Sequence, residues 1–189
     1  MDEVASKDAL LIVDVQVDFC PGGALPIEGG DGVVPVINEW IRKTRAAGRP
    51  VLASRDWHPT GHPSFVTSGG PWPVHCLQDS PGAAFHPDLE LPPDVIKVTK
   101  GTRFDRDQYS AFQDTGLEAC LERLGVERLL VGGLALDVCV KATVLDALEL
   151  GFQVRLLPGT SLPVTREGGR EALEVMRRAG AVCAEEGGA

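Results

Sequence analysis

One stretch of the chain, residues 56–76, concentrates the residue types that bind metals and ligands. It starts with Asp-Trp-His-Pro and ends with Pro-Trp-Pro-Val-His-Cys, and it holds three of the four histidines and two of the three tryptophans. A segment so rich in proline, glycine and serine cannot form a regular helix or a central strand. Because long loops in compact domains are usually functional or disordered, its Trp and His content predicts a metal or ligand loop built from Asp56, His58 and His75.

Cys139 is a second candidate for chemistry. It follows an apolar run at 128–131 through Gly-Gly-Leu-Ala-Leu and falls in the first turn of a predicted helix. The free N–H groups and the dipole of such a turn lower the pKa of a thiol, and the same N–H groups can bind an oxyanion. The alternative is a small buried apolar residue, since free cysteine is among the most buried residue types.

Asp14 and Lys100 each follow a predicted strand. A carboxylate after an all-apolar run is expected to be paired or to lie in a cleft, although Asp14 could instead cap the following turn. Lys100 is either a surface lysine or a cation beside a thiolate and an oxyanion. Together with Cys139 they give a base, a cation and a thiol at strand ends, which is the pattern of an activated nucleophile.

The elements that must position these residues are apolar runs that alternate with helical patterns. This alternation predicts an α/β protein: a three-layer, Rossmann-like fold with a mostly parallel six-stranded sheet and helices on both faces. Ligands bind such folds beyond the carboxyl ends of the strands, where the strand order reverses. The predicted strands are 9–13, 51–54, 95–99, 128–131, 153–157 and 181–184, and the predicted helices are 33–47, 115–124, 137–150 and 170–179.

The bulk properties favour a single soluble domain over residues 1–189, with its core at about 8–184 and an acidic, glycine-rich tail at 185–189. The net charge of -9 argues against nucleic acid as a partner, and no apolar run is long enough to cross a membrane. The five cysteines form no CxxC pair and residues 1–7 carry no secretory signal, so we expect a reducing, cytoplasmic location.

Other signals are weaker. The sequence Gly-Asp-Gly at 30–32 follows no strand directly and lacks the third glycine of a dinucleotide fingerprint. His62 and His86 each precede a proline, and we expect both to be exposed in loops. The remaining cysteines are expected to serve packing rather than chemistry; they are Cys20, Cys76, Cys120 and Cys183.

These motifs resemble the nicotinamidase family of the isochorismatase-like cysteine hydrolase superfamily. The specific part is Asp-Trp-His-Pro combined with Pro-Trp-Pro-x-His-Cys, and the resembling stretches, which cover almost the whole domain, are 11–25, 54–78, 97–112 and 132–147. The resemblance implies an amidohydrolase that converts nicotinamide, or an analogue, to nicotinate and ammonia through a thioester, in cytoplasmic NAD salvage. The resemblance leaves open whether the protein forms a homo-oligomer.

The resemblance also implies roles for particular residues. Asp14, Lys100 and Cys139 would form a catalytic triad. One divalent metal ion would be held by three other side chains, with zinc as the first choice and iron or manganese as alternatives; the implied ligands are Asp56, His58 and His75.

The same resemblance implies the residues around the substrate. Phe19 and Trp72 would sandwich the ring, and Leu134 would also contact the substrate. The backbone N–H groups of Ala135 and Cys139 would form the oxyanion hole, helped by a cis peptide bond between Leu134 and Ala135.

Two positions depart from the family pattern. Val17 stands where asparagine is frequent, and its expected effect is the loss of a local polar contact. Leu136 stands where threonine or serine is frequent, and we expect it to change the hydrogen bonds of the oxyanion loop or the width of the pocket.

Two other functions fit parts of the sequence. A metal-free amidase of the superfamily acting on carbamoyl or ureido compounds would need the triad but not the 56–76 loop. A non-enzymatic module with a structural zinc ion would need four ligands, with Cys76 as the fourth. Because adjacent residues project differently, Cys76 and His75 suit one ion poorly.

Overall fold

The computed structural model describes residues 3–183 and contains a six-stranded sheet in which every pair of neighbouring strands is parallel. The strands are β1 Asp8–Val13, β2 Val51–Asp56, β3 Ile96–Lys100, β4 Arg128–Leu134, β5 Gln153–Leu162 and β6 Val182–Cys183. The helices are α1 Val33–Ala46, α2 Leu117–Arg123, α3 Lys141–Glu149 and α4 Arg166–Ala179. The predicted α/β architecture is therefore confirmed.

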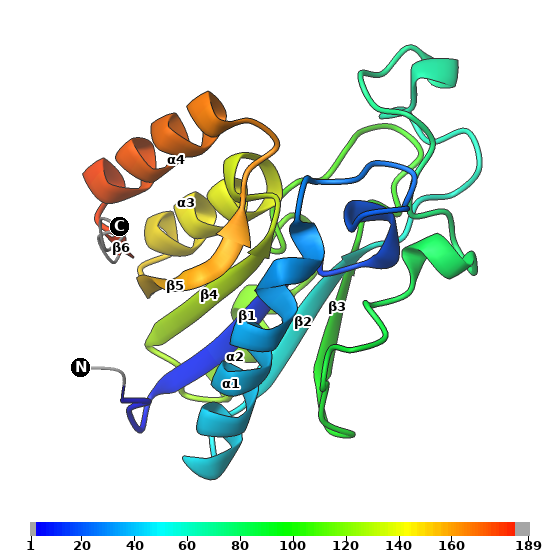
Figure 1. Ribbon diagram of the computed structural model, residues 1–189. Coiled ribbons are helices and arrows are strands. Elements are labelled where there is room, and N and C mark those ends of the chain that lie inside the picture. Colours follow the sequence, from blue (N-terminus) through cyan, green and yellow to red (C-terminus); the bar gives the residue numbers. More distant parts are fainter. Residues whose placement is uncertain (1–2, 184–189) are drawn as a thin grey trace.

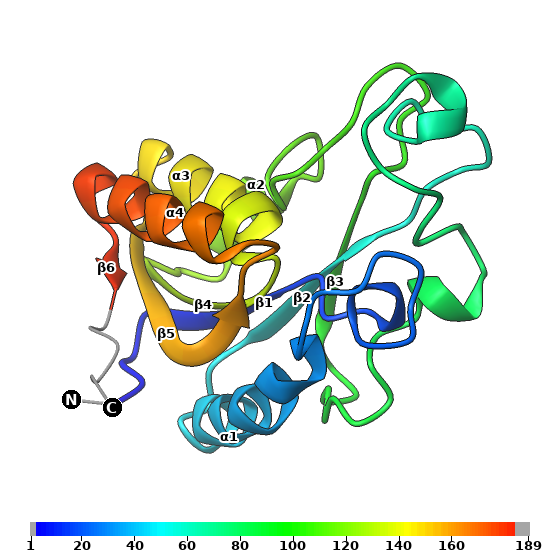
Figure 2. The ribbon, with the colours of Figure 1, turned by 45° about the horizontal axis from the view of Figure 1, so that its top comes forward.

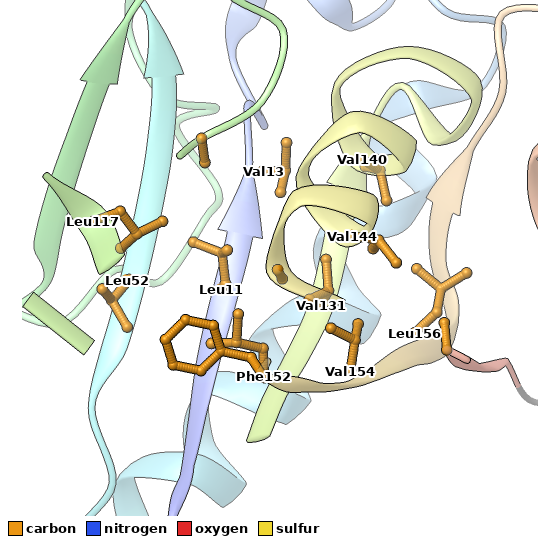
Figure 3. Packing of buried hydrophobic residues seen from close by; sticks show 14 of the residues in the cluster. Leu11, Val13, Leu52, Leu117, Val131, Val140, Val144, Phe152, Val154 and Leu156 are labelled. Carbon is orange, nitrogen blue, oxygen red and sulfur yellow. The ribbon is translucent and has the colours of Figure 1, made fainter. Parts of the chain in front are cut away.

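Helices cover both faces of the sheet, because the strand side chains alternate between two apolar cores. Leu10 and Ile12 pack on the side of α1, whereas Leu11 and Val13 pack on the side of α2, α3 and α4. Figures 1 and 2 show α1 on one side of the sheet and α3 and α4 on the other. Figure 3 shows Leu11 and Val13 of β1 and Val144 of α3 among the side chains of the second core. Central strands that are apolar on both faces are typical of parallel sheets.

The strand order is β3-β2-β1-β4-β5-β6. The chain adds β2 and β3 on one side of β1, then returns and adds β4, β5 and β6 on the other side, so the strand order reverses between β1 and β4. Directly after β1 the backbone turns at Asp14, whose φ is 49°. Directly after β4 the chain enters a single π-helical turn, Leu136–Val140. This reversal point is where doubly wound sheets place their ligands, and here it lies between the segments that carry Asp14 and Cys139.

Some predicted strand boundaries are wrong, and close packing accounts for the one in β4. Gly132 and Gly133 lie inside β4 instead of ending it. Position 133 needs glycine because a Cβ atom there would come within 2.0 Å of the Val13 carbonyl oxygen of β1. β5 continues through residues 158–159 with a shift in its pairing to β4. The predicted strand at 181–184 is observed as Val182–Cys183; its last residue and the predicted tail lie outside the described residues.

The segment between β2 and β3 has no long regular element. It contains two short 3-10 turns, Val66–Ser68 and Pro81–Ala83, and two isolated bridges, His58 to Leu77 and Phe65 to Trp72. Figures 1 and 2 show this loop beyond the ends of β2 and β3. Within residues 3–183 there is no helix with the length and apolar character needed to span a bilayer.

Candidate active site

Lys100 lies at the centre of a buried charge cluster. Its Nζ atom is 2.8 Å from Asp14 Oδ2 and 2.6 Å from Asp56 Oδ1, and it donates to Cys139 Sγ at 3.6 Å. Neither Lys100 nor Asp14 has any exposed surface. The sheet brings these residues together from the ends of β1, β2 and β3 and from the turn after β4, as the parallel topology predicted.

The two carboxyl groups beside Lys100 differ in their pKa. Burial raises the pKa of Asp14, against the opposing charge of Lys100. Burial also acts on Asp56, but Lys100 and His58 outweigh it and lower the pKa of that carboxyl. For Lys100 itself burial is overcome by both carboxylates, so its pKa rises well above the ordinary value. Lys100 therefore stays charged, Asp56 stays ionised, and Asp14 is the carboxyl that accepts a proton more readily.

The expected lowering of the Cys139 pKa is not what the structure gives. Burial raises the pKa of this thiol well above its ordinary value; Lys100 opposes the rise, and Asp14 and Asp56 add to it. The first turn of the helix is a π-helical turn, in which the Val140 N–H donates to the Ala135 carbonyl. The free thiol is thus favoured, and a nearby base has to remove its proton before sulfur can attack.

The loop side chains predicted to bind metal also converge. Ligand atoms of Asp56, His58 and His75 lie within 4.8 Å of one another. The Nδ1 atoms of both histidines lie beside backbone carbonyls, at 2.8 Å from Gly101 O and 2.7 Å from Pro73 O. Each Nδ1 can therefore carry the proton, which leaves Nε2 of each ring as the ligand atom.

Two further observations support this donor set. Burial lowers the pKa of His58, which favours the neutral imidazole that a metal requires. Asp56 uses Oδ1 to accept from Lys100, and Asp56 Oδ2 is 3.8 Å from His58 Nε2. Two imidazoles and one carboxylate oxygen thus face a common point, and these residues fit a divalent transition metal.

His62 does not lie where the sequence predicted. Instead of being exposed it is completely buried, with its Nδ1 atom 2.7 Å from Ser64 Oγ and its ring 4.2 Å from the ring of His58. The proline that follows it does not push the chain into solvent, because the His62 N–H donates to the Pro59 carbonyl in a compact turn. His86, the other histidine expected in a loop, is half-buried.

The pocket above the buried cluster is mostly apolar. The residues that line it are Phe19, Leu25, Pro26, Ile27, Asp56, His58, Trp72, His75, Asp107, Tyr109, Ala135, Val138, Cys139 and Val164. Among the predicted residues, Phe19, Trp72 and Ala135 reach the pocket wall, whereas Leu134 is fully buried and does not line it. The peptide bond between Leu134 and Ala135 is cis, as the resemblance implied.

Leu136 also points away from the pocket. Its side chain is buried in the core that α4 covers and lies near Gly169 of that helix, so the width of the pocket is set by other residues. Val17 is half-buried in the short turn after β1.

Tyr109 is a pocket residue that the sequence did not indicate. Its hydroxyl accepts a hydrogen bond of 3.0 Å from Trp72 Nε1, and Asp107 lines the same wall. Both lie in an irregular segment between β3 and α2, where no periodicity marks a residue as pocket-facing. The one available signal is that Tyr109 is the only tyrosine of the chain.

The sequence is similar to those of known proteins. Residues 8–186 match the isochorismatase domain. A nicotinamidase of Escherichia coli is 42% identical over 170 residues, which cover 79% of this chain and 80% of that protein.

Solved structures agree in both fold and sequence. A pyrazinamidase of Pyrococcus horikoshii in complex with zinc has a TM-score of 0.92 and 44% identity, covering 94% of this chain and 98% of that one. PnC1 of L. infantum in complex with nicotinate has a TM-score of 0.90 and 38% identity, covering 96% and 94%. The chain therefore belongs to the isochorismatase family.

Proposed function

We propose that this protein is a metal-dependent nicotinamidase, which hydrolyses nicotinamide to nicotinate and ammonia through a thioester on Cys139. The observation that carries the proposal is that one pocket joins two groups of residues. The thiol with its buried base and cation lies at the floor, and Asp56, His58 and His75 lie beside aromatic side chains on the wall. The relatives named as nicotinamidases and the neighbour bound to nicotinate support this substrate.

In the first half of the reaction we assign Asp14 as the base. Its carboxylate takes the proton of the Cys139 thiol, which suits a carboxyl whose pKa is raised by burial. The sulfur then attacks the carboxamide carbon, and the N–H groups of Ala135 and Cys139 stabilise the oxyanion. Lys100 stabilises the thiolate and holds both neighbouring carboxylates in place. Asp14 returns the proton to the amine, and ammonia leaves.

In the second half, water replaces ammonia at the same carbon. Asp14, again ionised, removes a proton from the water, whose oxygen attacks the thioester. The C–S bond breaks, the proton returns to the sulfur, and nicotinate is released. The same carboxylate serves both halves because its oxygen lies within 4.8 Å of Cys139 Sγ and burial raises its pKa, which suits a group that takes up and returns a proton.

The metal is assigned to recognition. Asp56, His58 and His75 would hold one divalent ion, and zinc is our first choice, supported by the zinc complex of the P. horikoshii pyrazinamidase. When bound, such an ion supplies a Lewis-acidic site for the ring nitrogen of the substrate. Phe19 and Trp72 would contact the ring, so that the carboxamide is directed at Cys139.

The direct test is ammonia release by the purified protein from a panel of amides. The panel contains nicotinamide, benzamide, which lacks the ring nitrogen, an aliphatic amide and a ureido compound. We expect nicotinamide to be preferred over benzamide by about 10²-fold or more in kcat/KM, because a site built for a polar group discriminates strongly against its absence. A preference for the ureido compound, or equal rates on nicotinamide and benzamide, would contradict the proposal.

We further propose that the enzyme works in the cytoplasm, in NAD salvage, as a single domain over residues 1–189 with its core at about 8–184. The match of residues 8–186 to one domain family supports the last point. The five cysteines, all of them free, suit a reducing compartment.

A further inference from the structure

Gln16 is a fully buried polar side chain for which the proposed mechanism has no use. It follows β1 by three residues, and none of its surface is exposed. A buried amide is normally retained only if its hydrogen bonds are satisfied. Its partners therefore indicate what it does.

All three hydrogen bonds of the Gln16 amide go to backbone, and two of them go to a single residue. Gln16 Nε2 donates to the Asp56 carbonyl at 2.8 Å, and Gln16 Oε1 accepts from the Asp56 N–H at 2.7 Å. The second Nε2 hydrogen goes to the Ala83 carbonyl at 2.9 Å. Asp56 is one of the three proposed metal ligands, so Gln16 holds the backbone of a ligand from both sides.

The topology explains why Asp56 needs this partner. β2 lies between β3 and β1, and its side toward β1 is paired up to Ser54, whose carbonyl accepts from the Asp14 N–H. There β1 ends and the chain turns away at Asp14. The next backbone N–H and C=O groups of β2 that point toward β1 are those of Asp56, and β1 ends before it can pair with them.

The amide of Gln16 takes the place of the missing strand. It presents one acceptor and one donor at the spacing of a peptide group, and it continues the ladder of β2 by one residue beyond the end of β1. From the geometry we infer that Gln16 is a positioning residue, which fixes the backbone of Asp56 and thereby aims its carboxylate at the metal position. This inference rests on the proposed metal-binding role of Asp56.

Asn38 offers a matched control elsewhere in the molecule. It is a buried amide on α1 that donates from Nδ2 to the Asp88 carbonyl at 2.8 Å and accepts from the Glu90 N–H at 2.9 Å. It thus makes two similar bonds to backbone, but its partners do not line the candidate active site. A loss of stability without a change at the metal position is therefore expected from Asn38 variants.

The test compares zinc binding by metal-free wild-type protein, Gln16→Met and Asn38→Leu, with the melting temperature of each metal-free protein measured alongside. We expect both variants to melt at lower temperature. Zinc affinity should fall about 10- to 100-fold for Gln16→Met, the range seen when groups that orient a ligand are removed, and should remain within about twofold of wild type for Asn38→Leu. Equal zinc affinity in the two variants would overturn the inference.

Gln16→Glu serves as a second variant if Gln16→Met does not fold. It keeps the acceptor for the Asp56 N–H and loses the donated bonds, so weaker zinc binding is again expected, and wild-type zinc affinity in this variant would overturn the inference. Absence of stoichiometric zinc binding by wild-type protein would instead contradict the proposed metal role, and the assignment of Gln16 with it.

Discussion

The floor and the wall of the pocket are built in different ways. Among the floor residues, Asp14 and Cys139 follow strands directly or within one turn, and Lys100 ends β3. They surround an ion-pair cluster with almost no exposed surface. On the wall, Asp56 ends β2, whereas His58 and His75 come from the irregular loop after β2, where their side chains bond to backbone carbonyls. These are the contacts of His58 with Gly101 and of His75 with Pro73.

This difference suits the two tasks that we propose. Groups that exchange protons need fixed distances, which a sheet supplies through its regular ladder. A loop can vary its sequence without disturbing that ladder, so it is the better place for substrate recognition. We therefore expect substitutions of floor residues to abolish the reaction, whereas substitutions of wall residues should change substrate binding.

The largest effect is expected at the thiol. Cys139→Ala should lower kcat by at least about 10³-fold, because the nucleophile is removed and the remaining groups cannot form a thioester. Ammonia release under saturating nicotinamide measures this. Cys20→Ala is the control, since Cys20 is an equally buried thiol outside the pocket, and it should keep near wild-type kcat. Near wild-type turnover by Cys139→Ala would contradict the assignment of Cys139 as the nucleophile.

Lys100→Met should combine loss of activity with loss of stability. Removing the buried ammonium leaves Asp14 and Asp56 without their counter-ion, which is expected to cost about 3–5 kcal/mol of unfolding free energy. Urea denaturation measures this. The control is Lys7→Met, whose ion pair with Glu127 is mostly exposed and should contribute at most about 1 kcal/mol. Similar losses in the two variants would argue against a tightly coupled floor.

Metal removal tests the wall. Chelation, or His58→Ala, should raise KM for nicotinamide about 10-fold or more or eliminate activity, while the circular dichroism of the sheet and helices is retained. His86→Ala, in a histidine that does not line the pocket, should leave KM and metal content unchanged. Full activity in protein shown to contain no metal would contradict the recognition role of the loop.

A smaller effect is expected from the hydrogen bond between Trp72 and Tyr109. Trp72→Phe keeps an aromatic face and removes the donor, so KM should rise about 2- to 10-fold with kcat little changed. Tyr109→Phe removes the same bond from the other side and should match it, and the double variant should add little to either. A fall in kcat without a change in KM would show that this wall also serves chemistry.

The smallest effect concerns pH. Because burial raises the pKa of Asp14 and the base must be ionised, kcat/KM should fall as pH drops through that raised value. Ser54 Oγ donates to Asp14 Oδ1 at 2.7 Å, which favours the ionised form. Ser54→Ala should therefore move the acid limb of the pH profile to higher pH. A shift toward lower pH, or no shift, would count against Asp14 as the base.

Much of the floor was predictable from sequence. Asp14 follows an all-apolar run, Lys100 follows the predicted strand 95–99, and parallel strands bring such ends to one edge. Their residue types then indicated a base and a cation. What the pattern could not give was that Lys100 contacts Asp56 as well as Asp14, because that contact depends on the register between β2 and β3.

The sequence by itself determined the fold class, the strand ends that carry the candidate catalytic residues and the histidine-rich loop, since these follow from apolar periodicity and residue type. Only the tertiary structure decided the burial of His62, the raised pKa of Cys139, the pocket position of Tyr109 and the partner of Gln16. Each of these depends on which groups far apart in the chain surround a side chain. The local sequence pattern does not predict those surroundings, because burial and long-range hydrogen bonding arise only when the layers pack.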